Sequence, residues 1–312
     1  MFKDIVLAIT PSEVCEHAAD KAFAFAQRFE SNLNIVHVTG MERGWGEMEF
    51  LECSGETARI TKNIEEYYCE KLKGCGNHKV TVVAGVPHNE ILRIARKVDA
   101  DLIIMGQHTK QYEETRSKVW GMAGSTLEQV SQRARCPVMI VTREAPYGEQ
   151  RMKTFMVATD FSKQSECAVA YGGQLCRHYG GELLVFHAVG DDQLPTPDDR
   201  RTRSYRERMQ EEFDYLLRGV PKVEYLCEYG HPAMEILKLA RNRNADLVLM
   251  AHHSKEKDPE KAFLGSVVVQ VALNSASPTM SINRYFDLRC GMMYDQQGGV
   301  TTKSAQKEPA PA

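Results

Sequence analysis

Short runs of apolar residues alternate along the first half of the chain with longer segments that are apolar at helical spacing. Within the runs, apolar residues occupy consecutive positions, which is typical of parallel strands that helices cover on both faces. The segment 89–98 carries an apolar stripe at helical spacing, as expected for a helix that packs on a sheet. We expect strands at 4–10, 33–39, 79–84, 101–106 and 137–142.

The second half of the chain repeats this pattern. The matching segments are 4–12 with 154–162, 35–38 with 185–188, 85–87 with 230–232, 100–105 with 245–250, and 124–125 with 265–266. Several matches in the same order indicate a duplicated unit. We predict two tandem Rossmann-like α/β domains, 1–142 and 153–284, each with a five-stranded parallel sheet and helices on both faces. A linker at 143–152 joins them, and 285–312 forms a C-terminal extension, largely a disordered tail with no strand after Tyr285.

Composition adds little beyond a globular class. The 312 residues are 43% hydrophobic and 26% charged, and the net charge of -3 gives no basic excess for nucleic acid or an anionic membrane. No apolar run approaches the ~20 residues that span a bilayer, and the chain starts on a strand pattern, so we expect a cytoplasmic protein. The nine cysteines form no C-x-x-C pair, which favours reduced thiols and no metal site.

Chemistry is expected where parallel strands end, because diverging connections leave a crevice there. The first strand of each copy ends at Thr10 or Asp160. The loops after the fourth strands lead to Gly124-Ser125 and Gly265-Ser266, which open helices whose free N–H groups can hold a phosphate. Helix capping explains the same residues without a ligand, and both interpretations stay open.

These motifs resemble the universal stress protein family, whose members end strand one in an acidic residue and carry G-x2-G-x9-G-[S/T] after strand four. The resemblance extends to about Arg284. It implies five-stranded parallel sheets and, in one branch of the family, ATP held across strands one and four, with Mg2+ only alongside ATP. Another branch binds no nucleotide. It also implies that the last strands, 137–142 and 278–284, pair between the domains, giving an intramolecular pseudo-dimer, and it allows a homodimer of whole chains.

Neither copy keeps the complete signature. In the first copy Thr10 replaces the acid and Thr109 the middle glycine, while in the second Ala251 and Ser254 replace two glycines and Asp160 is kept. A Cβ at a glycine position can block the approach of a phosphate. The candidate nucleotide-binding residues are Thr10, Val38, Gly106, His108, Thr109, Gly124, Ser125 and Thr126 in the first copy, and Ala158, Thr159, Asp160, Ala188, Ala251, His253, Ser254, Gly265, Ser266 and Val267 in the second.

The residues indicate binding and no catalysis. Ser125 and Ser266 lack the His and Asp partners of an activated nucleophile, and His37 and His187 lie in apolar strands as satisfied core histidines. The resemblance implies a stress-response protein that binds ATP or another adenine nucleotide as a regulatory module. The alternatives are a nucleotide-free dimerisation scaffold and, at most, weak ATP hydrolysis.

Overall fold

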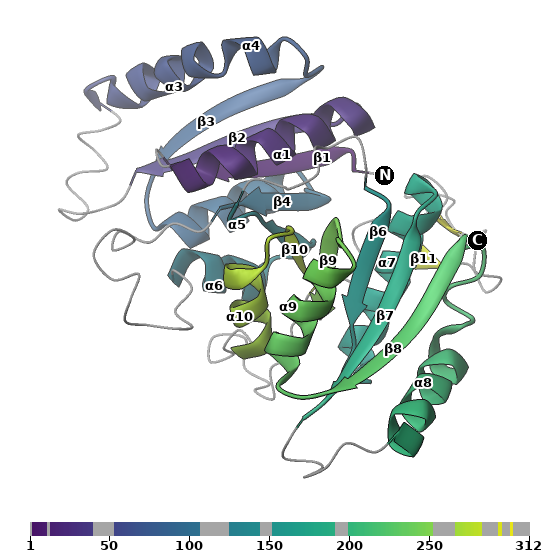
Figure 1. The fold of residues 1–312 in the computed structure, drawn as a ribbon. Helices are drawn as coiled ribbons and strands as arrows, with labels where there is room; N and C mark the ends of the chain where they lie inside the picture. Colours follow the sequence, from purple (N-terminus) through teal and green to yellow (C-terminus); the bar gives the residue numbers. More distant parts are fainter. Residues whose placement is uncertain are drawn as a thin grey trace, which may run out of the picture.

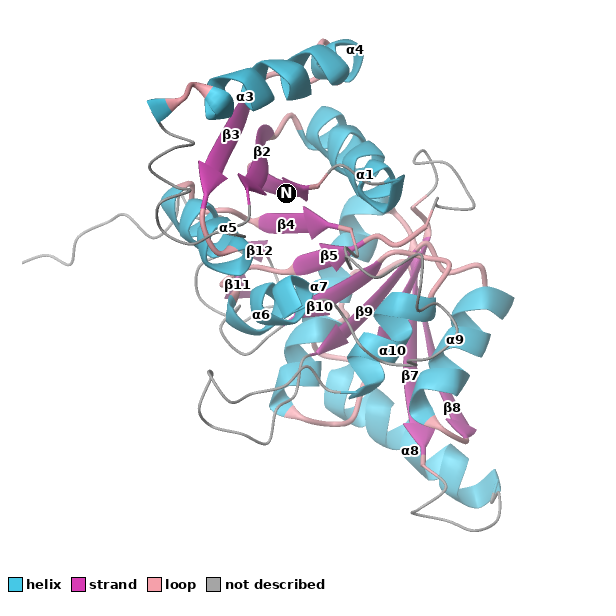
Figure 2. Cartoon of the chain, turned by 90° about the vertical axis from the view of Figure 1, so that its left-hand side faces the viewer, coloured by secondary structure: helices cyan, strands magenta, loops and turns pink. Residues whose placement is uncertain are grey.

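A computed structural model describes residues 2–10, 13–39, 53–106, 125–143, 152–190, 199–251, 266–282, 293–294 and 300–301. Ten strands of this part form a single sheet in the order β3-β2-β1-β4-β5-β10-β9-β6-β7-β8, and helices cover both of its faces (Figures 1 and 2). The α/β architecture predicted from the alternating pattern is confirmed.

The first five strands are parallel and form domain 1. Its elements are β1 (Asp4–Ile9), α1 (Glu13–Phe29), β2 (Asn32–Thr39), α3 (Glu56–Tyr67), α4 (Cys69–Leu72), β3 (His78–Ala84), α5 (Pro87–Lys97), β4 (Leu102–Met105), α6 (Ser125–Arg133) and β5 (Val138–Ile140). All four residues of β4 are buried, which explains why this strand reads as a continuous apolar run.

Domain 2 repeats the topology with parallel strands β6 to β10. Its elements are β6 (Thr154–Ala158), α7 (Lys163–Tyr179), β7 (Glu182–Val189), α8 (Asp199–Phe213), β8 (Lys222–Tyr229), α9 (Pro232–Asn242), β9 (Leu247–Ala251), α10 (Ser266–Asn274) and β10 (Thr279–Ile282). The helices α1 and α7 pack on the first strands of their domains, while α5 contacts α6 and α9 contacts α10.

One aspartate in each domain ties the first strand to the fourth at the amino edge of the sheet. The Oδ2 atom of Asp101 accepts from the backbone N–H groups of Lys3 at 2.8 Å and Asp4 at 3.1 Å. In domain 2, Oδ2 of Asp246 accepts from those of Lys153 and Thr154, both at 2.8 Å. The duplication seen in the sequence therefore extends to individual hydrogen bonds.

The domains join edge to edge through antiparallel pairing of β5 and β10. Met139 and Met280 lie opposite each other at the centre of the pairing, and both are fully buried. The predicted pairing of the last strands within one chain is confirmed, although the strands are shorter than the expected 137–142 and 278–284. We call this β5–β10 junction the seam.

The helical layer beside the seam has the same approximate twofold symmetry. Arg28 and Phe29 close α1 in the positions that His178 and Tyr179 hold in α7. The Arg28 guanidinium lies 4.5 Å from the Tyr179 ring centre, and the ring centres of Phe29 and His178 are 5.1 Å apart. Domain 1 thus contributes a guanidinium and an aromatic ring to the contact, and domain 2 contributes an imidazole and an aromatic ring.

One expectation about the extension is wrong. Met293–Tyr294 (β11) and Val300–Thr301 (β12) pair antiparallel, where no strand was expected after Tyr285. Two-residue strands are too short to produce a hydrophobic alternation that a sequence pattern can reveal. Residues 144–151 of the linker lie outside the described part, and the boundaries of linker and extension stay predictions.

The seam predicts that the separated halves associate. Segments 1–143 and 152–282, expressed apart and mixed, are expected to form a 1:1 complex in size-exclusion chromatography with light scattering, because each half alone leaves a buried strand edge open. Met139→Asp should abolish the complex, since its carboxylate would be buried at the seam. Two halves that stay monomeric at micromolar concentration would contradict the pairing.

Candidate functional site

The strand register of domain 2 brings small residues together at the carboxyl edge of the sheet. Ala158, the last residue of β6, pairs with Phe186 on one side and Met250 on the other. Ala251, the last residue of β9, therefore lies one position beyond Met250, and Ala188 lies two positions beyond Phe186 on β7. The three alanines are half-buried and lie at the ends of three neighbouring strands.

Asp160 lies at this edge, two positions after β6, and its side chain is exposed. Its Oδ1 atom accepts from the backbone N–H of Ser162 at 3.0 Å and from the Ser162 hydroxyl at 2.5 Å. Ser162 is in turn the N-cap of α7, where its Oγ accepts from the N–H of Ser165 at 3.2 Å. The carboxylate is thus held in place at the positive end of a 17-residue helix, where a negative charge is favoured.

A histidine fixes the end of the first strand in both domains. Nδ1 of His187 lies 2.8 Å from the carbonyl oxygen of Thr159, and Nδ1 of His37 lies 3.1 Å from that of Ile9. A carbonyl can only accept, so each Nδ1 carries the proton. The interpretation of both residues as hydrogen-bonded strand histidines agrees with this geometry.

Burial lowers the pKa of His187, while its hydrogen bond to Thr159 and the nearby charge of Asp160 oppose that shift and Arg208 adds to it. The folded protein therefore favours the neutral imidazole. With Nδ1 donating to the carbonyl, His187 acts as a structural support beneath Asp160 rather than as a charged group.

Phe161, which the sequence analysis did not single out as a site residue, shapes the same edge. Its backbone adopts a positive φ of 61°, which is uncommon for a residue other than glycine. Its ring centre lies 4.7 Å from that of His187, and the Arg208 guanidinium from α8 lies 4.0 Å from the ring centre. The aromatic contacts hold the turn that carries Asp160, and no local sequence signal predicts such a φ.

The corresponding edge of domain 1 is built differently. Thr10 takes the place of the acid, and its Oγ1 lies 3.0 Å from Sγ of the buried Cys15 in the first turn of α1. Val38 and Gly106 are buried beside it, and Thr126 is half-buried at the second position of α6. Among the described residues, this edge has a threonine hydroxyl where domain 2 has a carboxylate, and that hydroxyl already contacts a thiol.

The phosphate-binding loops expected in both domains are only partly within the described residues. The helices α6 and α10 begin at Ser125 and Ser266, as predicted, and Val267 is half-buried. His108, Thr109, Gly124, His253, Ser254 and Gly265 lie outside the described part. In that part there is no group of three His, Cys, Asp or Glu side chains that could hold a metal ion, and none of its helices has the length and apolar content to cross a membrane.

The model of the universal stress protein family matches residues 1–142 and again residues 152–282. The chain belongs to the universal stress protein family. It contains two domains of that family in tandem, as the repeat predicted. The lengths of the alignments with known relatives agree with this division into two domains.

Two universal stress proteins of Methanocaldococcus jannaschii align with about half of the chain. One is 30% identical over 152 residues, which are 46% of this chain and 84% of that protein. The other is 28% identical over 163 residues, covering 46% of this chain and 97% of that protein. A crystal structure of a universal stress protein from Archaeoglobus fulgidus covers 90% of this chain and 96% of its own, with 21% identity and a TM-score of 0.67. This last likeness supports the two-domain fold.

The lowered pKa of His187 predicts a loss of stability in acid. A histidine whose pKa is lowered on folding stabilises the protein above its unfolded value, and this contribution is lost as the pH falls from about 6.5 through the folded pKa. Measured by urea unfolding, the free energy of unfolding should fall more between pH 7 and pH 5 in the wild-type protein than in His187→Asn, whose amide can still donate to Thr159. His231→Asn, at an exposed N-cap, should keep the wild-type fall, and an equal fall in all three proteins would contradict the assignment.

Proposed function

We propose that this universal stress protein binds ATP or another adenine nucleotide at the carboxyl edge of domain 2 and acts as a regulatory binding module in a cytoplasmic stress response. The observation that carries the proposal is the exposed carboxylate of Asp160, held at the end of β6 beside the half-buried Ala188 and Ala251. Mg2+ would enter only with ATP.

The residues of domain 2 fit a nucleotide laid across β6 and β9. The Asp160 carboxylate is a strong acceptor for ribose hydroxyls, and the alanines at the neighbouring strand ends leave space for a planar base. The first turn of α10, at Ser266 and Val267, presents free backbone N–H groups to phosphates. The site offers binding groups and no activated nucleophile, so the proposal assigns binding and at most slow hydrolysis.

Domain 1 is the weaker candidate for the same ligand. Thr10 offers a single hydroxyl, which lies within hydrogen-bond distance of the Cys15 thiol. Replacing a carboxylate by a hydroxyl removes the charge-assisted hydrogen bond to ribose. The phosphate-facing positions Gly106 and Thr126 do not compensate for that loss at the sugar.

A second candidate function is a scaffold that binds no nucleotide. The continuous ten-stranded sheet favours it, because the β5–β10 pairing joins the two domains through backbone hydrogen bonds. In that case the strand ends would keep only their structural roles, such as the Asp160–Ser162 hydrogen bonds that support α7. Uptake of nucleotide by the purified protein separates the two candidates.

Substitutions at the ends of the first strands test the proposed site. Asp160→Ala is expected to weaken ATP binding by about 10- to 100-fold, the cost of losing a hydrogen bond to a charged group, in isothermal titration calorimetry. Asp160→Asn should weaken binding but keep an acceptor for Ser162, so its melting temperature should stay close to that of the wild type. Thr10→Val is the matched control in domain 1 and should bind ATP normally.

The stoichiometry and the controls decide the outcome. About one ATP per chain, lost on substitution of Asp160 alone, supports the domain 2 site. Equal losses in the Asp160 and Thr10 variants would indicate that both domains bind. No uptake by the wild-type protein at millimolar ATP would reject nucleotide binding and favour the scaffold.

A further inference from the structure

The helix α8 lies on the outer side of domain 2, beside the edge strand β8 (Figures 1 and 2). One side of the helix packs on β8 and α7, and Thr202, Met209 and Phe213 are buried there. The opposite side is exposed along most of the 15-residue helix and includes much of the arginine-rich sequence 200–208. The proposed nucleotide site does not use this surface.

The charges on the exposed side of α8 are separated by sign. Arg200 and Arg203 lie toward the start of the helix, and Glu207 and Glu211 lie toward its end. All four residues are exposed, and their spacing of three, four and four positions places them along one line on the helix surface. Ser204, which is also exposed, lies between the two signs. We call the four charged residues the α8 stripe.

This order of charges opposes the dipole of the helix. The start of a helix carries a partial positive charge and its end a partial negative charge, so arginines near the start and glutamates near the end are disfavoured. Asp199 at the first position follows the favourable order, but no basic residue lies in the last turn. A second α8 lying antiparallel would offset this penalty, because the arginines of each helix would then adjoin the glutamates of the other.

The corresponding helix of domain 1 does not separate its charges in this way. In α3 the basic residues Arg59 and Lys62 form ion pairs with glutamates three and four positions away. In α8 an ion pair of this kind joins Arg208 to Glu212, beside the stripe. The charges of α3 are thus matched within the helix, whereas the α8 stripe presents each sign as a block of its own.

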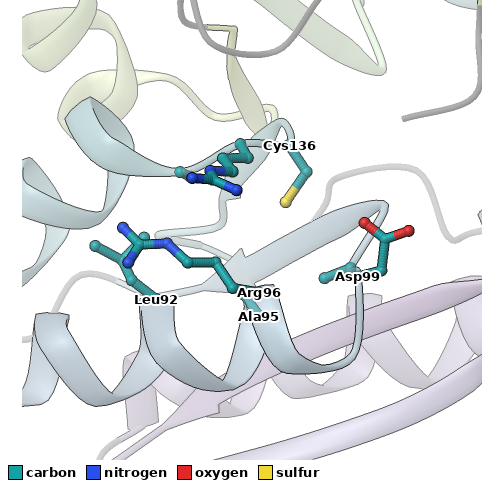
Figure 3. A pocket seen from close by; sticks show the side chains of 8 residues that line it. Leu92, Ala95, Arg96, Asp99 and Cys136 are labelled. Carbon is teal, nitrogen blue, oxygen red and sulfur yellow. The ribbon is translucent and has the colours of Figure 1, made fainter. Parts of the chain in front are cut away.

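An arginine of domain 1 shows the favourable placement. Arg96 lies in the last turn of α5 and lines a small pocket of about 30 Å³ together with Asp99 and Cys136 (Figure 3). A basic side chain at this end of a helix is stabilised by the dipole, and Asp99 supplies a carboxylate to the same pocket. The surroundings within domain 1 therefore account for this charge, whereas the dipole of α8 opposes the charges of the stripe.

We propose that the α8 stripe binds the α8 stripe of a second copy of the chain, with the two helices antiparallel. A twofold axis beside Ser204 places Arg203 opposite the partner's Glu207. It also places Arg200 opposite the partner's Glu211, and the symmetry repeats each contact. The small side chain of Ser204 at the axis permits the helices to approach. This inference does not depend on nucleotide binding.

A second copy fits the stripe better than an acidic peptide or a nucleic acid does. Either of those would be attracted by Arg200 and Arg203 but repelled by Glu207 and Glu211, whereas an antiparallel α8 matches all four. The contact consists of exposed ion pairs, which individually contribute little and are screened by salt. The dimer is therefore expected to be weak and to dissociate as the ionic strength rises. A stripe that is only solvated predicts a monomer at every salt concentration.

Charge reversals in the full-length protein test the contact by sedimentation velocity, from micromolar to submillimolar concentration in low salt. The double variants Arg200→Glu/Arg203→Glu and Glu207→Arg/Glu211→Arg are each expected to weaken self-association by at least about tenfold, because like charges then face each other. Mixed in equal amounts, the two variants should associate with each other, since one stripe is then wholly acidic and the other wholly basic. Raising the salt to about 0.5 M should dissociate the wild-type dimer.

Arg59→Glu/Lys62→Glu on α3 is the matched control, because it changes the net charge as much as the arginine variant does and also at two exposed positions. It should associate like the wild type, and melting temperatures check that every variant is folded. A wild-type protein that stays monomeric in low salt rejects the proposal, even if it retains a polyglutamate peptide or an oligonucleotide. Equal weakening by the α3 control, or stripe variants that do not associate when mixed, also rejects it.

Discussion

The antiparallel hydrogen bonding between β5 and β10 is the interaction on which the rest of the architecture depends. Each domain alone has a parallel sheet whose last strand is short and fully buried, so neither edge could face water without exposing apolar side chains and unpaired backbone groups. Pairing the two edges satisfies both at once. The approximate twofold symmetry of the seam then brings the ends of α1 and α7 together, where Arg28 and Phe29 meet Tyr179 and His178.

The same pairing determines which parts of the two domains are neighbours. In an antiparallel seam, the carboxyl edge of one domain adjoins the amino edge of the other, so each candidate site has a flank built by the opposite repeat. A single chain that carries both repeats is free to vary the two flanks separately. The two repeats have also diverged at the ends of their own first strands, where Asp160 in domain 2 corresponds to Thr10 in domain 1. This difference lies on the described edges of one sheet, and it supports the proposal that a ligand with ribose hydroxyls binds in domain 2.

Much of the fold could be predicted because the second half of the sequence repeats the pattern of the first half. The repeat of 100–105 at 245–250 predicted β4 and β9, and the proline after Cys136 and Ser277 marked the start of the final strands. Other features depend on partners distant in the chain. Asp101 and Asp246 appear in the repeat, but only the folded sheet shows that they bind the start of the first strand. Likewise, the positive φ of Phe161 depends on rings from β7 and α8, which no local pattern around Asp160 specifies.

The sequence analysis treated each departure from the family signature as the loss of a binding feature. In the structure, these departures differ in their physical consequences. At Ala251 the replacement for glycine adds only a methyl group, and this residue is half-buried at the strand end. At Thr10 the change is larger, because a charged acceptor is replaced by a hydroxyl that contacts Cys15. A glycine lost from one repeat and an acid lost from the other are therefore not equivalent. No described neighbour of Thr10 restores a carboxylate, and this asymmetry is the physical basis for proposing domain 2 as the nucleotide-binding domain.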